Sequence, residues 1–436
     1  MNAVDLGRLQ FAVTALLHFS FVVLTLGLAP VLAWLTTRAA WARDADRRAV
    51  LERMARFWGQ VYVVNYALGI VSGLVMEFQF GLSWTGLSRL TGDVFGRTLA
   101  LETILAFFLE STFLGVWILG RGRLPRWAHV GSFYAVTLTA YASAFWIMVT
   151  NGFLQHPVGY ARRPDGTMRL TDLTALLGNE GALPALIHLA TAALAVAGFL
   201  MAGASAWQFL HGTRDPEVFR RSLRTGVVVG LAGIWLTVGD GFAQLRFVES
   251  QSGKSAAIHG DTAALARIQA DLAERLGPGE HAPPAWLAHA YNGMQSIGYL
   301  CWLIAVVAAC FFFRRRIERS RVLLRILLFA VPLPYVAVLC GWLIRELGRQ
   351  PWAVYGQLTV TDALSDVSAG SMLFSLLLFA GALGALAVTD WLLIARLVRR
   401  GTDRMLLWTT EDEEAARVAP KDPVKEGTSH SWTSSG

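Results

Sequence analysis

The stretch FAVTALLHFSFVVLTLGLAPVLAWL, residues 11–35, contains no Asp, Glu, Lys or Arg. About 20 apolar residues cross the hydrocarbon core of a bilayer as a helix, so this stretch predicts a transmembrane helix. It is too long for the core of a signal peptide, and no basic region precedes it. We therefore expect the segment to be retained in a mature chain that begins near Met1.

The rest of the chain resembles this stretch in composition. Of the 436 residues, 54% are hydrophobic and 16% charged, with 16 Trp and 24 Phe, which excludes a soluble protein and indicates an all-α, multi-pass membrane protein. The same measure predicts nine transmembrane helices. They are expected at residues 10–36, 57–79, 98–119, 127–152, 184–210, 222–244, 287–313, 323–345 and 371–397.

Arginines gather in every second connection, after spans 1, 3, 5 and 7. Cytoplasmic loops carry an excess of Lys and Arg, which predicts an outer N-terminus and a cytoplasmic C-terminus. The net charge of +7 is mostly this bias, so we expect no nucleic-acid partner. The residues concerned are Arg38, Arg43, Arg47, Arg48, Arg53 and Arg56, then GRGRLPR (120–126), then Arg214, Arg220, Arg221 and Arg224, and finally Arg314, Arg315, Arg316, Arg319, Arg321 and Arg325.

Two segments are expected outside the membrane domain, which we place at residues 1–401. Residues 245–286 form an outer loop, in which TAALARIQADLAERLG (262–277) has the spacing of an amphipathic helix. Residues 402–436 are polar and predict a disordered cytoplasmic tail.

The cysteines narrow the chemistry. Cys301, Cys310 and Cys340 all lie within predicted spans, without a CxxC motif, so neither disulfides nor a thiolate zinc site is indicated. Because CxxCH is also absent, any haem has to be held without covalent attachment.

Several ionisable or ligating side chains lie at one depth, near the outer ends of the spans. Such groups are costly in a bilayer and usually mark pathways or cofactors. Haem iron accepts His and Met as axial ligands, and a His/Met pair gives a six-coordinate electron-transfer centre, whereas a carboxylate or a single His leaves an iron position open. The residues are His18, Glu77, Glu102, His188, Met294 and Glu346.

Each residue alone also has a structural explanation. An intramembrane His can hydrogen-bond a neighbouring helix, Met294 can fill the core, and Glu346 can form an ion pair with Arg345 or Arg349. A haem-free, proton-coupled transporter would use buried carboxylates and His as well. It would not need Met294.

Glu110 follows Glu102 by eight residues, a little over two turns deeper on nearly the same face of span 3. Two carboxylates stacked in this way could relay protons from the cytoplasmic half toward an outer reaction site. The structural alternative is a buried Glu110 satisfied by Ser111 or Thr112.

Five stretches together resemble subunit I of the cytochrome bd-type terminal oxidases, along nearly the whole chain apart from the tail. The most specific is the last. They are GRLQFAVTALLHFSFVVLTLG (7–27), FWGQVYVVNYALGIVSGLVMEFQFG (57–81), DVFGRTLALETILAFFLESTF (93–113), FWIMVTNGFLQHP (145–157) and GWLIRELGRQPWAVYGQL (341–358).

The resemblance implies a nine-span subunit of the bacterial cytoplasmic membrane that reduces oxygen to water with electrons from quinol. It implies two b-type haems and one d-type haem, a second membrane subunit, and in some members small single-span subunits. His188 and Met294 would ligate the low-spin b haem, and His18 and Glu346 would ligate one high-spin haem each. Glu102 would stand beside the high-spin pair.

The remaining roles are implied in the same way. Glu110 would belong to the cytoplasmic proton pathway, Trp342 would lie among the haems, and Arg349 would pair with haem propionates. Quinol would bind near the outer loop, where Lys254 and His259 are the candidate residues.

Two departures bear on the electron donor. Asn292 occupies the place of an Arg that family members usually carry two residues before the methionine. In QSGKSAAIHG (251–260), Gln251 and Lys254 match the family loop, but His259 replaces its acidic residue; a histidine can also accept a proton near neutral pH. A bd-like haem protein with another donor or acceptor therefore stays open as an alternative.

Overall fold

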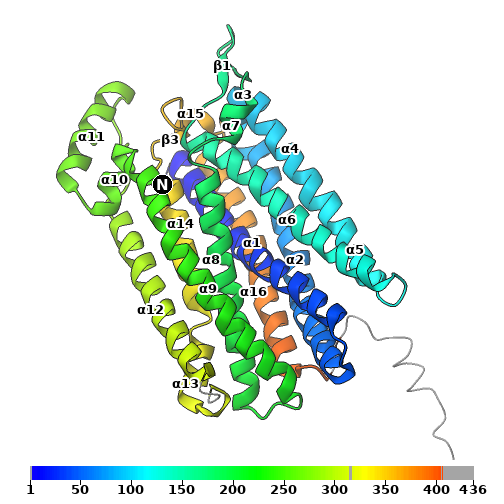
Figure 1. The fold of residues 1–436 in the computed structure, drawn as a ribbon. Coiled ribbons are helices and arrows are strands. Elements are labelled where there is room, and N and C mark those ends of the chain that lie inside the picture. The colour runs from blue at the N-terminus through cyan, green and yellow to red at the C-terminus, as the bar shows by residue number, and fades with distance from the viewer. Residues whose placement is uncertain (1, 314–316, 404, 406–436) are drawn as a thin grey trace, which may run out of the picture.

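The computed structural model describes residues 2–313, 317–403 and 405. Within these residues, nine helices are long and apolar enough to cross a membrane, which confirms the predicted all-α, multi-pass fold. Figure 1 shows them as one elongated bundle, with the outer-loop helices and the N-terminus at one end. The connections that follow the first, third and fifth spans lie at the other end. Nearly all of the predicted tail, 402–436, lies outside the described residues.

The first two spans are α1 (Ala3–Trp41) and α2 (Ala45–Ser83), of 39 residues each. At about 1.5 Å per residue they exceed the roughly 30 Å of a hydrocarbon core, so both project beyond it. Asn2 and Asp44 cap their first turns, which satisfies amide groups that have no partner within the helix. The two helices pack closely along the bundle.

The third span is an α-helix interrupted by two π-helical segments. A π-helical turn is rare in proteins and often occurs at a functional site. Here one π segment ends at Glu110, and Glu102 lies in the short α-helix before it. In chain order the span consists of α3 (Thr85–Thr91), η1 (Gly92–Gly96), α4 (Arg97–Thr103), η2 (Ile104–Glu110) and α5 (Ser111–Leu119).

The fourth to seventh spans are uninterrupted helices. Glycines let the fifth and sixth approach closely, because a Cβ on Gly198 would lie 2.2 Å from the backbone nitrogen of Gly230. The four helices are α6 (Arg126–Gln155), α8 (Leu183–Leu210), α9 (Pro216–Glu249) and α12 (Leu287–Phe313).

The predicted span 323–345 is two helices, α13 (Arg321–Phe329) and α14 (Pro332–Leu347). Proline lacks the amide hydrogen that a continuous helix needs and is accepted in the first turn of a new one. Pro332 therefore begins α14, which carries the GWLIRELG motif. The last span is α16 (Ala369–Arg400).

Short elements lie at the ends of the bundle, and all of them except η3 lie at the end where the N-terminus is. Helix α11 confirms the predicted amphipathic helix, and its Leu265 packs with Ala256, Ala257 and Leu287. The pairs β1–β2 and β3–β4 are antiparallel. These elements are β1 (Tyr160–Arg162), β2 (Met168–Leu170), α7 (Leu173–Leu177), α10 (Ser252–His259), α11 (Thr262–Leu276), η3 (Ile317–Arg319, at the opposite end), β3 (Trp352–Val354), β4 (Leu358–Thr359) and α15 (Val360–Ala363).

Gly198→Ala should destabilise the bundle, because the added Cβ meets the α9 backbone. Overpacking typically costs about 1–3 kcal/mol, so we expect the apparent Tm of the purified protein in detergent to fall by several degrees. Gly131→Ala is the matched control, since a Cβ there meets nothing within 4 Å. Equal Tm values for the two variants would contradict the close α8–α9 contact.

Candidate functional site

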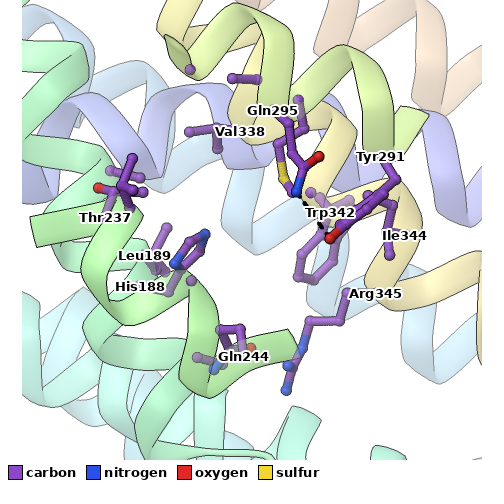
Figure 2. A pocket seen from close by; sticks show the side chains of 18 of the residues that line it. His188, Leu189, Thr237, Gln244, Tyr291, Gln295, Val338, Trp342, Ile344 and Arg345 are labelled. Atoms are coloured by element: carbon purple, nitrogen blue, oxygen red, sulfur yellow. Dashed lines mark hydrogen bonds between the residues drawn. The ribbon is translucent and has the colours of Figure 1, made fainter. Parts of the chain in front are cut away.

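A cavity of about 280 Å³ lies between α8, α9, α12 and α14. Most of its lining is apolar, and His188 and Met294 both contribute to it. Figure 2 shows His188 on one side and Tyr291, Gln295 and Trp342 on the other. The fold thus brings together the two residues that the sequence proposed as an axial pair.

Two features prepare these side chains as ligands. Nδ1 of His188 lies 3.4 Å from the Asp240 carboxylate but forms no hydrogen bond with it, so a carboxylate that could orient a metal-bound imidazole stands beside the ring. Gly341 makes room for Met294, because a Cβ there would lie 3.2 Å from its sulfur. A nitrogen and a sulfur donor within one apolar cavity fit a haem iron.

Trp342 connects this cavity to a second one. Its side chain lines both and stacks on Phe19, with ring centroids 4.9 Å apart. Its buried Nε1 has no hydrogen-bond partner among the residues that the structure describes. The tryptophan therefore lies between two spaces and has a free donor.

The second cavity has a volume of about 60 Å³, and Glu346, Arg349 and Arg8 are among its lining residues. Glu346 Oε2 accepts from Arg349 Nη2 at 2.7 Å, and Oε1 accepts from Asn151 Nδ2 at 2.7 Å. The ion pair expected as an alternative thus exists with Arg349. Both side chains are 7% exposed, so the pair is buried and not a rim contact.

Arg349 is held in place by the chain that follows it. Its Nη1 donates to the Ala353 carbonyl at 2.6 Å, and its buried Nε has no partner within the described part of the chain. An orphaned guanidinium nitrogen fits a further anionic group such as a carboxylate.

His18 lies elsewhere, between α1 and α2. The Ser72 hydroxyl donates to the Gly69 carbonyl at 2.6 Å, so Ser72 Oγ accepts from His18 Nδ1 at 2.8 Å. This assigns the Nδ1–H tautomer and leaves a lone pair on Nε2. Gly73 lies against the ring, where a Cβ would be 3.1 Å from Cε1. The ring is therefore oriented as a ligand would be.

The acidic residues of span 3 have partners on different helices. Glu102 accepts from Ser143 on α6 at 2.9 Å, while Glu110 accepts from Tyr62 on α2 at 3.0 Å. The hydrogen-bond partner of the buried Glu110 is thus Tyr62, and not Ser111 or Thr112, the partners expected in the structural alternative. The Ser111 hydroxyl instead contacts the Tyr66 hydroxyl at 2.9 Å. Glu77 accepts a hydrogen bond from Thr103.

The two candidate quinol-binding residues, Lys254 and His259, differ in solvent exposure. Lys254 is 1% exposed and lines the large cavity, and its Nζ donates to Gln155 Oε1 at 2.6 Å. Burial lowers the pKa of Lys254 well below its usual value; Arg345 and Arg349 lower it further and Glu346 opposes them. His259 is exposed, with Nε2 3.3 Å from the Glu249 carboxylate.

Sequence reasoning did not assign a role to Asn151, Gln155 or Asp240. Asn151 and Gln155 are four residues apart at the end of α6, so they share one helix face. In the sequence, the only indication of a role for these residues was the presence of two amide side chains four residues apart near the end of a span. Only the fold shows that they meet Glu346.

Comparison with known proteins shows the family to which the chain belongs. A sequence profile of the family described as cytochrome bd terminal oxidase subunit I matches residues 6–274 and 271–402. The cytochrome bd ubiquinol oxidase subunit 1 of Bacillus subtilis (strain 168) is 32% identical, over 92% of this chain and 95% of its own length. The cytochrome bd-II ubiquinol oxidase subunit 1 of Escherichia coli (strain K12) is 28% identical, over 93% and 98%.

A solved structure supports the fold. The bd oxidase from Geobacillus thermodenitrificans superposes with a TM-score of 0.80 at 21% identity, covering 92% of this chain and 99% of that one. The chain is a multi-pass, haem-dependent membrane subunit of the terminal oxidase class. It belongs to the cytochrome bd terminal oxidase subunit I family.

Met294→Leu should remove the low-spin haem signature from the absorption spectrum, because leucine has no sulfur to ligate iron. Carbon monoxide binding should persist, since it requires only an open iron position. Met148→Leu is the matched control, a buried methionine that lines the same cavity. A low-spin spectrum unchanged by Met294→Leu would refute this ligand assignment.

Proposed function

We propose that this chain is subunit I of a bd-type quinol:oxygen oxidoreductase that takes electrons from quinol at the outer face and reduces oxygen to water with cytoplasmic protons. The observation that supports this most is the pair of cavities joined by Trp342, one lined by His188 and Met294 and the other by Glu346. The family makes the protein an oxidoreductase of the respiratory chain.

The residues divide among three haems, two of b type and one of d type. His188 and Met294 would hold the low-spin haem, while His18 and Glu346 would each hold a high-spin one. Bound haem would supply one-electron transfer and the oxygen-binding iron. Arg349, whose Nε is unpaired in the described residues, would hold a propionate.

The outer loop would bind quinol. His259 would accept a proton from a quinol hydroxyl, and the Glu249 carboxylate 3.3 Å away would stabilise the resulting imidazolium. Arg345 also lines the large cavity, where it would supply a positive charge in place of the arginine that Asn292 replaces.

Protons would enter from the opposite side. Positive-inside bias places the N-terminus outside and residues 402–436 in the cytoplasm. Glu110, held by Tyr62 in the span, and Glu102, nearer the outer end, would pass protons outward. Quinol oxidation would release protons at the outer face, and oxygen reduction would take up protons from the cytoplasm. Charge would therefore be separated across the membrane without a proton pump.

The membrane faces of the bundle leave room for partners. In the third and ninth spans only 11% and 17% of the most apolar window is buried within this chain. A second membrane subunit, and small single-span subunits, would cover part of these faces, with lipid of the bacterial cytoplasmic membrane on the rest. The polar segment 402–436 would extend into the cytoplasm beyond the 1–401 domain.

A bd-like haem protein with a different electron donor is the second candidate. It is favoured by Asn292 and by the exposed His259, which replaces the family's acidic residue. Full haem absorption without ubiquinol oxidation would select this candidate.

The proposal is tested by a dithionite-reduced minus oxidised spectrum of the purified complex, repeated under carbon monoxide. We expect b-haem bands, a far-red chlorin band and a carbon monoxide shift, together with oxygen uptake driven by ubiquinol-1. Absence of all haem bands would refute it, and b-haem bands alone would refute the chlorin assignment.

Glu110→Gln should slow oxygen uptake by about tenfold or more. An amide cannot take up and release a proton near neutral pH, and a positioned proton-transfer group contributes a large factor to the reaction rate. Haem content and spectrum should stay unchanged. Glu274→Gln, on the exposed face of α11, should behave like the wild type. Wild-type turnover in Glu110→Gln would remove this residue from the proton route.

A further inference from the structure

A chain of buried polar contacts runs from the outer-loop helix α10 to Glu346. Lys254 is 1% exposed, Gln155 0% and Glu346 9%. Lys254 Nζ donates to Gln155 Oε1 at 2.6 Å, and Gln155 Nε2 donates to Glu346 Oε1 at 3.5 Å. One glutamine therefore lies between the proposed quinol loop and a proposed haem ligand.

The orientation of the Gln155 amide is fixed by its neighbours. A backbone carbonyl only accepts, so Nε2 must face the Arg345 carbonyl, 3.0 Å away, and Oε1 then faces Lys254 Nζ. A flipped amide would oppose donor to donor and acceptor to acceptor. The side chain therefore contacts Lys254 on one side and the Arg345 carbonyl and Glu346 on the other in one fixed orientation.

Glu346 Oε1 is held by a second amide as well. Asn151 Nδ2 donates to it at 2.7 Å, and Asn151 Oδ1 in turn accepts from Arg345 Nε at 2.5 Å. Both amides project from α6, so this helix sets the direction of the carboxylate. Gln155 is the one of the two that also contacts the loop.

Helix α10 is seated tightly on this network. The Gln251 side chain donates to the Gln155 carbonyl at 2.7 Å. A Cβ on Gly348 would lie 2.7 Å from Lys254 Cγ, so the lysine stem fills the space over the end of α14. A displacement of α10 therefore cannot occur without moving Lys254 from Gln155.

We propose that Gln155 is a positioning residue that couples the quinol-loop helix α10 to the Glu346 carboxylate, so that ubiquinol bound at the loop changes ligand affinity at the haem that Glu346 holds. The inference rests on the proposed function for the quinol loop and for Glu346. Coupling between two sites is reciprocal, so a ligand at that haem must change ubiquinol affinity by the same factor.

The test measures carbon monoxide affinity of the dithionite-reduced complex from its absorption spectrum, with and without excess ubiquinol-1. In the wild type we expect at least about a fivefold change in the carbon monoxide Kd on adding ubiquinol-1, the lower end of typical coupling energies. Gln155→Leu should abolish the change, as should Lys254→Met. Gln155→Glu keeps the acceptor for Lys254 but loses the donor to Glu346, and should abolish it too.

Gln208→Leu is the matched control, a buried glutamine that bonds the Val398 carbonyl at the other end of the bundle. It should retain the wild-type response. If Gln155→Leu does not assemble with haem, Gln155→Glu decides the question by the same measurement, because it leaves Lys254 in place.

Three outcomes separate the two hypotheses. A ubiquinol-1 effect of wild-type size in the Gln155 variants overturns the coupling role. The coupling role is also overturned if the wild type oxidises ubiquinol-1 but shows no effect on carbon monoxide affinity, and the proposed function then stands. A wild type without haem or without ubiquinol oxidation instead refutes the proposed function itself.

Discussion

The buried ion pair between Glu346 and Arg349 is the contact on which the end of the bundle nearest the N-terminus depends. Removing a carboxylate and a guanidinium from water costs several kcal/mol per ion unless their remaining lone pairs and protons are satisfied. Here the Asn151 amide and the Ala353 carbonyl supply two such contacts at 2.7 and 2.6 Å, and Arg349 Nε alone has no partner among the described residues. The end of α14, the end of α6 and the segment leading to β3 are thereby fixed to one another.

The same constraint explains why so much of the polar chemistry is shared between helices. A bilayer offers no water to an unpaired group, so Glu102 and Glu110 each accept from a hydroxyl on a neighbouring helix. Those bonds fix the direction of the side chains without neutralising them through an ion pair. Carboxylates held by hydroxyls can exchange a proton without breaking a salt bridge.

Small residues provide the space that a large planar cofactor requires. Gly341 accommodates the Met294 sulfur and Gly73 accommodates the His18 ring. Trp342 then separates the two cavities. A family that binds haem without covalent attachment relies on such shape, because the axial ligands and a few arginines are the only strong bonds available to the protein.

Sequence alone determined the spans, because a stretch of about 20 apolar residues has few alternatives to a membrane helix. It also placed His18, His188, Met294 and Glu346 at one depth, since rise per residue is fixed. It did not determine which of them share a cavity, because depth says nothing about the neighbours of a helix. Neither the break between α13 and α14, inside the predicted span 323–345, nor the partner of Glu110 was predicted.

Tertiary structure alone decided that α10 turns inward and buries Lys254 against Gln155. A lysine in a polar loop is expected at the surface, and only the packing of three segments distant in sequence overrides that preference. The amides Asn151 and Gln155 acquire their place in the site in the same way. Their partners are more than 90 residues away along the chain, and a hydrogen bond over that separation is set by the fold, not by local sequence.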